Sequence, residues 1–453
     1  MESNREFLGT EPVGKLLFRL ALPTVAAQLI NMLYNVVDRI FIGHMPGDGA
    51  LALTGVGVCM PIIMLISAFA ALVSSGGAPR ASIHMGKKEY DTAENILGNC
   101  FALLLCISVV LTAVLLIFGD RLLLLFGASE NTIEYASAYL RIYALGTIFV
   151  QLTLGLNMFI TAQGFSRIAM FTVLIGALCN ILLDFVFIRL MHLGVEGAAF
   201  ATVISQALSC VWCIVFLTGK KTFLKIRRKY LRLKRGVILP CVALGFATFI
   251  MQASESILNV CFNASLLKHG GDMAVGAMTI CTSIMLFVML PLQGMGQGAQ
   301  PISSYNYGAN CPERVRATFR LLLKLCVAYA AVLWAAMIIF PKAFAGIFAD
   351  DAALLDYAVR AIRVYCGALL LMGVQMACQL TFVSIGNAPC SIIVAVVRKF
   401  VLLIPLIYIL PGLVKDPAIG VFMAEPVADV LAVTFTVILF SVQFKKALKK
   451  IET

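Results

Sequence analysis

The sequence predicts an all-α membrane protein with twelve transmembrane helices in two pseudo-symmetric six-helix lobes. Three observations predict this fold class: an extreme apolar composition, apolar segments of membrane-spanning length, and an internal repeat. Of the 453 residues, 61% are hydrophobic and 13% are charged, whereas a soluble domain averages roughly 45–50% apolar and about 25% charged residues. With a mean hydropathy of +0.96, the chain has too little polar surface to be globular in water.

Polar residues, glycines and prolines divide the chain into twelve apolar segments. Crossing about 30 Å of hydrocarbon takes about 20 helical residues, and each segment reaches this length. The polar N-terminus contains no short apolar core before a cleavage site, so we expect the first span, and not a cleaved signal peptide, to direct insertion. The expected spans are residues 16–43, 52–77, 96–119, 134–160, 168–190, 197–218, 238–266, 274–300, 317–340, 357–384, 391–411 and 418–441.

The distribution of Lys and Arg predicts the orientation, because short basic loops stay in the cytoplasm. The stretch "GKKTFLKIRRKYLRLKRG" between spans six and seven holds nine basic residues, and four lysines lie between positions 445 and 450. The six loops on the other side hold only Arg121, Arg189, Lys268, Lys342 and Lys415. We therefore expect a multi-pass membrane protein with both termini in the cytoplasm.

The same distribution explains the net charge of +12, so we expect the lipid bilayer and not nucleic acid as the partner. Most of the fourteen cysteines fall inside expected spans. Cys210 and Cys213 form a CxxC that lies mid-helix without a second CxxC, which favours apolar packing over redox or zinc chemistry.

The two halves of the chain repeat each other. "FGASENTIEYASAYLRIYALG" (126–146) aligns with "FADDAALLDYAVRAIRVYCGA" (348–368) at an offset of 222, which also pairs Pro79 with Pro301. The predicted parts are an N-terminal lobe (1–218), a basic cytoplasmic linker (219–237) and a C-terminal lobe with a basic tail (238–453). Six helices of like orientation in each half form a parallel repeat, an organisation typical of transporters that rock one lobe against the other.

Four polar residues of the first lobe are expected at one membrane depth. Asp38 and Asp184 each lie five residues before the end of an outward-running span, and Thr202 lies five residues after the start of an inward-running one. At 1.5 Å per residue, all three are about 8 Å from the helix ends. Asn180 precedes Asp184 by four residues and shares its helix face.

Acids inside a membrane are costly and by default functional. Two carboxylates with an amide and a hydroxyl form a set of hard oxygen ligands, and their mutual repulsion favours binding of a proton or a small cation such as Na⁺. We therefore expect ion coupling at Asp38, Asn180, Asp184 and Thr202. The alternative is that Asp38 pairs with an arginine and fixes helix packing. Arg39 lies about 100° around the helix from Asp38 and is expected to snorkel.

In the second lobe, Glu255 follows Pro240 by fifteen residues, as Asp38 follows Pro23. It is interpreted as the counterpart of Asp38 and as a second cation or proton site, an attractor of cationic substrate, or a buried packing acid. Glu425 and Asp429 are weaker candidates, because Arg398 and Lys399 could neutralise them.

Spans one, two, seven and eight are expected to line a central cleft. Methionine and aromatic side chains there would form an adaptable surface, although they more often serve packing or lipid contact. The candidate cleft residues are Gln28, Asn31, Tyr34, Asn35, Met251, Gln252, Met285, Phe287 and Met289.

The chain resembles the multidrug and toxic compound extrusion (MATE) family over residues 15–441. The resemblance rests on "LPTVAAQLINMLYNVVDRIFIGHM", "GGAPRASIHMGKK", "NILLDFVFI", "GVEGAAFATVISQ" and "QGMGQGAQPISSYNYGA", in this order. It implies export of cationic amphipathic compounds by antiport with H⁺, or with Na⁺ at the first-lobe cluster, and no other cofactor. Asp38 then matches the first-helix acid, and Asn180, Asp184 and Thr202 match the polar cation site.

Glu255 matches the seventh-helix acid of the sodium-coupled branch, but span ten lacks that branch's acid. The chain is therefore more similar to the bacterial branch related to the DNA-damage-inducible exporter, and proton coupling is favoured. This resemblance also implies the plasma membrane of a bacterial cell. The alternative is a lipid-linked saccharide flippase of the same superfamily, which should line its cleft with Arg or Lys. An intramembrane enzyme is disfavoured because HExxH and GxSxG motifs are missing. We expect a monomer.

Overall fold

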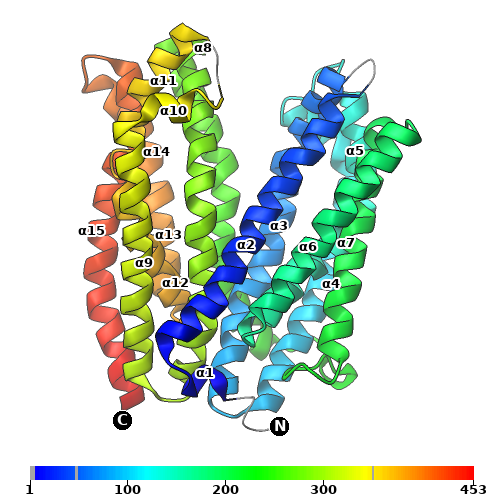
Figure 1. Ribbon diagram of the computed structural model, residues 1–453, viewed down its shortest axis with the longest axis vertical. Helices are drawn as coiled ribbons and strands as arrows, with labels where there is room; N and C mark the ends of the chain where they lie inside the picture. Colours follow the sequence, from blue (N-terminus) through cyan, green and yellow to red (C-terminus); the bar gives the residue numbers. More distant parts are fainter. Residues whose placement is uncertain (1–5, 46–48, 349–350, 453) are drawn as a thin grey trace.

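The computed structural model describes residues 6–45, 49–348 and 351–452, and every regular element in these ranges is a helix. Figure 1 shows two groups of helices that lie together near α1 and the end of α15 and diverge toward the opposite end. We call α2–α7 the first bundle and α8–α15 the second bundle. The predicted all-helical fold is confirmed.

The first bundle contains long helices that follow the apolar segments of the sequence. Prolines inside α2 and α3 do not end these helices, as is common where neighbouring helices satisfy the freed backbone groups. The elements are α1 (Phe7–Thr10), α2 (Val13–Gly43), α3 (Gly49–Gly86), α4 (Tyr90–Leu125), α5 (Ile133–Ala162), α6 (Ser166–Asp184), a π-helix η2 (Phe185–Leu190) and α7 (Gly194–Thr218).

The second bundle begins after a connection that contains the short helix η3 (Arg228–Tyr230). Its first helix, α8 (Arg235–Gly308), is broken at Gly271, whose φ of 64° and ψ of −162° suit glycine alone. The remaining elements are α9 (Pro312–Ile339), α10 (Pro341–Ala345), α11 (Ala352–Tyr365), α12 (Leu369–Ser384), α13 (Ala388–Val396), a π-helix η4 (Val397–Leu403), α14 (Ile404–Ile409), η5 (Leu410–Gly412) and α15 (Pro417–Glu452).

The span count agrees with the expectation. Ten stretches of helix are long and apolar enough to cross a membrane, and the pair α11 and α12, bent by 47°, meets the same criterion together. Because the break at Gly271 makes α8 two spans, the described part of the chain holds twelve.

Helix boundaries repeat at the sequence offset. α3 and α8 end at Gly86 and Gly308, and α6 and α13 begin at Ser166 and Ala388, each pair 222 positions apart. The pseudo-symmetry of the sequence is therefore also a symmetry of where the helices stop and start.

Glycines allow the two bundles to touch backbone to backbone. A Cβ on Gly76 of α3 would lie 1.9 Å from the carbonyl oxygen of Cys241, and one on Gly245 of α8 would lie 2.0 Å from that of Leu72. Such distances exclude any side chain unless the helices separate. Small residues serve this purpose in membrane helices, where close approach provides much of the association energy.

This close contact between the bundles, which we call the seam, predicts that alanine substitutions at two glycines of α3 have different effects on stability. Gly76→Ala should lower the thermal unfolding temperature of the purified protein, because the added methyl overpacks the contact with Cys241 at a cost of about 1–3 kcal/mol. Gly57→Ala is the matched control: its Cβ would meet nothing within 4 Å, and alanine favours a helix by about 1 kcal/mol. Equal unfolding temperatures for the two variants would contradict the predicted overpacking at this seam.

The N-terminal segment joins the bundles at the end where they lie together. The Arg314 guanidinium donates to the backbone oxygens of Leu8 and Glu11 at 3.2 and 2.7 Å, and the Asn306 amide donates to Leu8 O at 2.9 Å. Residues of α8 and α9 thus hold the chain just ahead of α2, which links the two bundles at this end of the molecule.

Candidate functional site

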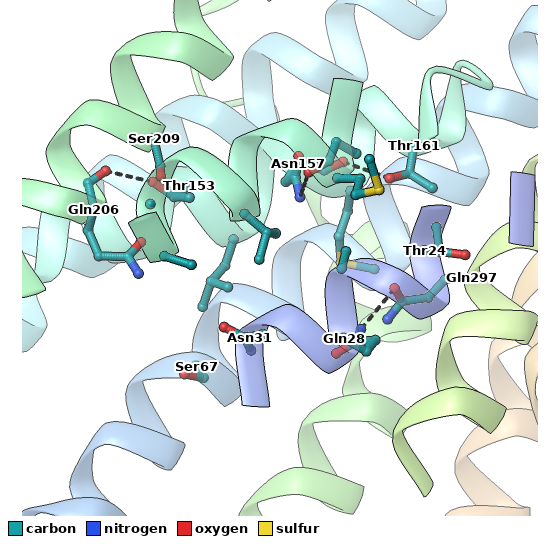
Figure 2. A pocket seen from close by; sticks show the side chains of 18 of the residues that line it. Thr24, Gln28, Asn31, Ser67, Thr153, Asn157, Thr161, Gln206, Ser209 and Gln297 are labelled. Atoms are coloured by element: carbon teal, nitrogen blue, oxygen red, sulfur yellow. Dashed lines mark hydrogen bonds between the residues drawn. The ribbon is translucent and has the colours of Figure 1, made fainter. Parts of the chain in front are cut away.

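A cavity of about 310 Å³ lies between the two bundles, walled by α2, α3, α5, α6, α7 and α8. This volume lies at the lower end of the range for small-molecule sites. Figure 2 shows amide and hydroxyl groups from several helices around it. They include Thr24, Gln28, Asn31, Ser67, Thr153, Asn157, Thr161, Gln206, Ser209 and Gln297.

The wall of the cavity is polar but uncharged as far as the structure describes it, since none of the described lining residues carries a formal charge. Gln28 donates to Gln297 across the two bundles at 3.1 Å. Asn157 donates to Ala169 O at 3.2 Å, while its own Oδ1 and the Oε1 of Gln206 are buried and meet no donor in the described part of the chain. Buried acceptors of this kind need a partner, so the wall offers hydrogen-bond acceptors to a ligand with N–H or O–H groups.

The four predicted ion-coupling residues gather next to this cavity. Asn180 and Thr202 line it, and the Asn180 amide donates to the Thr202 hydroxyl at 3.4 Å. Behind them, Asp38 and Asp184 are 9% and 0% exposed. Their carboxyl groups are close enough to share a hydrogen bond once one holds a proton.

Four oxygen atoms of this cluster lack a hydrogen-bond donor among the described residues. Asp38 Oδ1, both carboxyl oxygens of Asp184 and Asn180 Oδ1 are buried and meet no donor among the described residues. Leaving such groups unsatisfied is expensive, and a proton or a small oxygen-seeking cation would satisfy them. Within the described ranges no three His, Cys, Asp or Glu side chains converge as a metal site. Carboxylate, amide and hydroxyl oxygens are ligands that hard cations prefer and that transition metals bind less readily than nitrogen or sulfur.

The sequence does not predict two features of the cluster. Tyr139 of α5 is buried, stacks on Tyr143 and places its hydroxyl beside Thr202. Asp184 is the last residue of α6, immediately before the π-helix η2. π-Helical turns are frequent at functional sites, but no residue pattern in "NILLDFVFI" signals one.

Comparison with known proteins identifies the chain. The MatE family model matches residues 23–186 and 247–409, one stretch in each half and more than half of the chain. The chain belongs to the MatE family. This membership makes it a multi-pass membrane transporter and not an enzyme.

Relatives and solved structures agree with this placement. The chain is 25% identical over 422 residues to the multidrug export protein MepA of Staphylococcus haemolyticus, covering 93% of this chain and 92% of that one. MepA of Staphylococcus aureus strain NCTC 8325 is 22% identical, covering 89% and 88%. The fold matches the outward-facing conformation of a multidrug resistance MATE family transporter, with a TM-score of 0.91, 23% identity and 98% coverage of each chain.

In this MatE protein Glu255 corresponds to Asn35, and the expected correspondence with Asp38 is wrong. Leu72 of α3 contacts Gly245 in the first half of α8, and the equivalent contact joins Gly294, in the second half of α8, to Val25 of α2. Leu72 and Gly294 are 222 positions apart, whereas Val25 and Gly245 are 220 positions apart. The same two offsets relate Gly76–Cys241 to Gly298–Ala21. Counting from prolines misplaced Glu255 by three residues, because Pro23 and Pro240 are not equivalent.

Five charged side chains of the second bundle pair with one another. Lys399 Nζ lies 2.7 Å from Glu255 Oε1, and Arg398 lies 3.0 Å from Glu425 and 2.8 Å from Asp429. Arg398 therefore provides the expected neutralisation of Glu425 and Asp429, whereas Lys399 forms an ion pair with Glu255.

The candidate cleft residues divide into two groups. Gln28, Asn31, Tyr34 and Gln252 line the central cavity, whereas the other five do not. Met285 and Met289 pack against the hydrophobic core, Phe287 lies on the exposed surface, and the Asn35 amide donates to Asn31 O at 2.6 Å. Met251 borders a separate pocket in the second bundle. Helix rotation, which the sequence leaves open, decides this division.

Proposed function

We propose that the chain is a secondary active multidrug efflux transporter that exports cationic amphipathic compounds in exchange for protons, with Na⁺ as the alternative coupling ion. One observation supports exchange above all: Asn180 and Thr202 belong both to the cavity wall and to the cluster around Asp38 and Asp184. A ligand in the cavity and an ion at the acids would compete for the same two side chains. Competition of this kind is what antiport requires.

The sequence of events follows from that competition. A substrate in the cavity hydrogen-bonds to the unpartnered amide oxygens of Asn157 and Gln206, and its positive charge is drawn toward Asp38 and Asp184. Arrival of a proton or Na⁺ at the acids removes this attraction and releases the substrate. With the termini in the cytoplasm, the divergent end of the bundles faces outward, so the described conformation is the one that releases substrate and takes up the ion.

The cavity wall favours a cationic substrate over a lipid-linked pyrophosphate, because its described lining residues include no Lys or Arg. The relatives named multidrug export protein support the same cargo class. We propose that one chain in the plasma membrane of a bacterium forms the complete transporter, because all the helices that wall the cavity belong to it.

Transport into inverted membrane vesicles tests the proposal. A vesicle lumen more acidic than the medium should drive ethidium accumulation, since protons leave as the dye enters. A Na⁺ gradient at equal pH tests the alternative ion, and vesicles without the protein are the control. If neither gradient accelerates ethidium accumulation, the proposal that this chain exchanges its substrate for a cation is wrong.

A further inference from the structure

The second bundle holds a filled counterpart of the substrate cavity. A pocket of only about 10 Å³ lies there, bordered by Met251, by α12, by α13 and by the start of η4. When the offsets of 220 for Met251 and 222 for the others are applied, seven of its nine lining positions correspond to residues that line the central cavity. Pseudo-symmetry thus provides two equivalent pockets, of which one is open.

The hydrogen bonds confirm that the pockets are equivalent. Gln379 corresponds to Asn157, and its amide donates to Ser391 O at 3.1 Å as Asn157 donates to Ala169 O at 3.2 Å. Ser391 and Ala169 are themselves 222 positions apart. Gln379 Oε1 is also buried and meets no donor in the described chain, as is Asn157 Oδ1.

Two positions explain why the second pocket is closed. Arg398 and Lys399 stand where the first bundle has Gly176 and Ala177, which both line the open cavity. The long side chains of Arg398 and Lys399 occupy the space that glycine and alanine leave free. Their charged ends then meet the acids of the second bundle, with Lys399 on Glu255.

The pair of Lys399 and Glu255 is unequal in exposure. The Lys399 side chain is 7% exposed and that of Glu255 is 51% exposed. Glu255 follows Gln252, a lining residue of the central cavity, by three positions and so shares its helix face. The carboxylate is therefore open to the space between the bundles, while the ammonium approaches it from inside the second bundle.

We infer that Lys399 is a tethered cation: its ammonium occupies a second cation-binding site on Glu255 and, with Arg398, closes this pocket to substrate. Cation binding is thereby confined to the first bundle. This inference rests on the proposed function for the nature of the cargo, but its site is a different one. A small primary ammonium ion is the chemical class that would bind if Lys399 were removed.

The test uses the purified full-length protein and n-propylammonium, which resembles the end of a lysine side chain. Lys399→Ala should bind one propylammonium ion per chain at least about tenfold more tightly than the wild type. Lys399→Ala combined with Glu255→Gln should lose that gain. Lys342→Ala, which removes an exposed lysine paired with Asp356, is the control and should bind as the wild type does. Calorimetry or ligand-dependent thermal unfolding reads the binding.

A second variant keeps the test independent of any loss of folding. Glu255→Gln with Lys399→Met removes both charges and keeps the pocket filled, a replacement that buried ion pairs often tolerate. Its affinity for tetraphenylphosphonium should stay within about threefold of the wild type, because the second pocket contributes nothing to binding in the central cavity. A tenfold loss, or no propylammonium gain in Lys399→Ala, would overturn the inference. Failure of ethidium exchange would refute the proposed function and leave the propylammonium result standing.

Discussion

Asp38→Asn is expected to lower gradient-driven efflux sharply. The substitution keeps the size of the side chain and removes the charge that a proton or Na⁺ would neutralise next to Asp184. A hydrogen bond to a charged group contributes about 1.5–3 kcal/mol, so the driven rate should fall roughly 10- to 100-fold. Ethidium accumulation in inverted vesicles measures the rate.

Binding separates coupling from folding in this experiment. Asp38 does not line the central cavity, but in the proposed exchange neutralising the acids releases a cationic substrate. Tetraphenylphosphonium should therefore still bind the purified variant, more weakly than the wild type, and its affinity should depend less on pH or Na⁺. Asp120→Asn is the matched control, because Asp120 is an exposed acid paired with Arg141. Driven accumulation at the wild-type rate in Asp38→Asn would remove this acid from the mechanism.

Arg398→Met is expected to cause the largest loss of stability. Arg398 lies 3.0 Å from Glu425 and 2.8 Å from Asp429, with all three side chains buried. Removing the guanidinium leaves two buried carboxylates without their shared partner, and breaking a buried pair costs about 3–5 kcal/mol. Thermal unfolding in detergent should show a clear fall in the transition temperature.

Neutralising the partners should restore the stability. Combining Arg398→Met with Glu425→Gln and Asp429→Asn removes every charge of the group, and the unfolding temperature should return close to that of the wild type. Arg141→Met breaks an exposed pair with Asp120 and should cost no more than about 1 kcal/mol. A stable Arg398→Met protein would show that the two acids do not depend on this guanidinium.

The two bundles use their shared architecture in different ways. Gly176 and Ala177 leave an open cavity in the first bundle, and at the equivalent positions Arg398 and Lys399 fill the pocket of the second. A repeat that began as two equal halves would thus provide one site for exchange and one internal charge cluster. The proposed antiport and the tethered cation are two consequences of this asymmetry.

Residue-by-residue counting predicted positions along a helix well. Asp38, Asp184 and Thr202 were assigned one depth from the rise per residue, and the structure gathers them with Asn180 beside one cavity. The same counting failed for Glu255, because it used Pro23 and Pro240 as equivalent points. The contacts of Gly245 and Gly294 show that equivalent positions of α2 and α8 are three residues further apart in sequence than Pro23 and Pro240 are.

The sequence by itself determined that this chain is a twelve-helix membrane protein with two related halves, because the bilayer fixes the length and polarity of each span. It also identified Asp38 and Asp184 as candidate functional residues, since few acids are tolerated in apolar helices. Only the tertiary structure decided which side chains face the cavity. Met285 and Phe287 turn away from it, Tyr139 joins the acids, and Lys399 reaches Glu255. The rotation and axial register of each helix are set by close packing against its neighbours, which hydropathy along one chain does not encode.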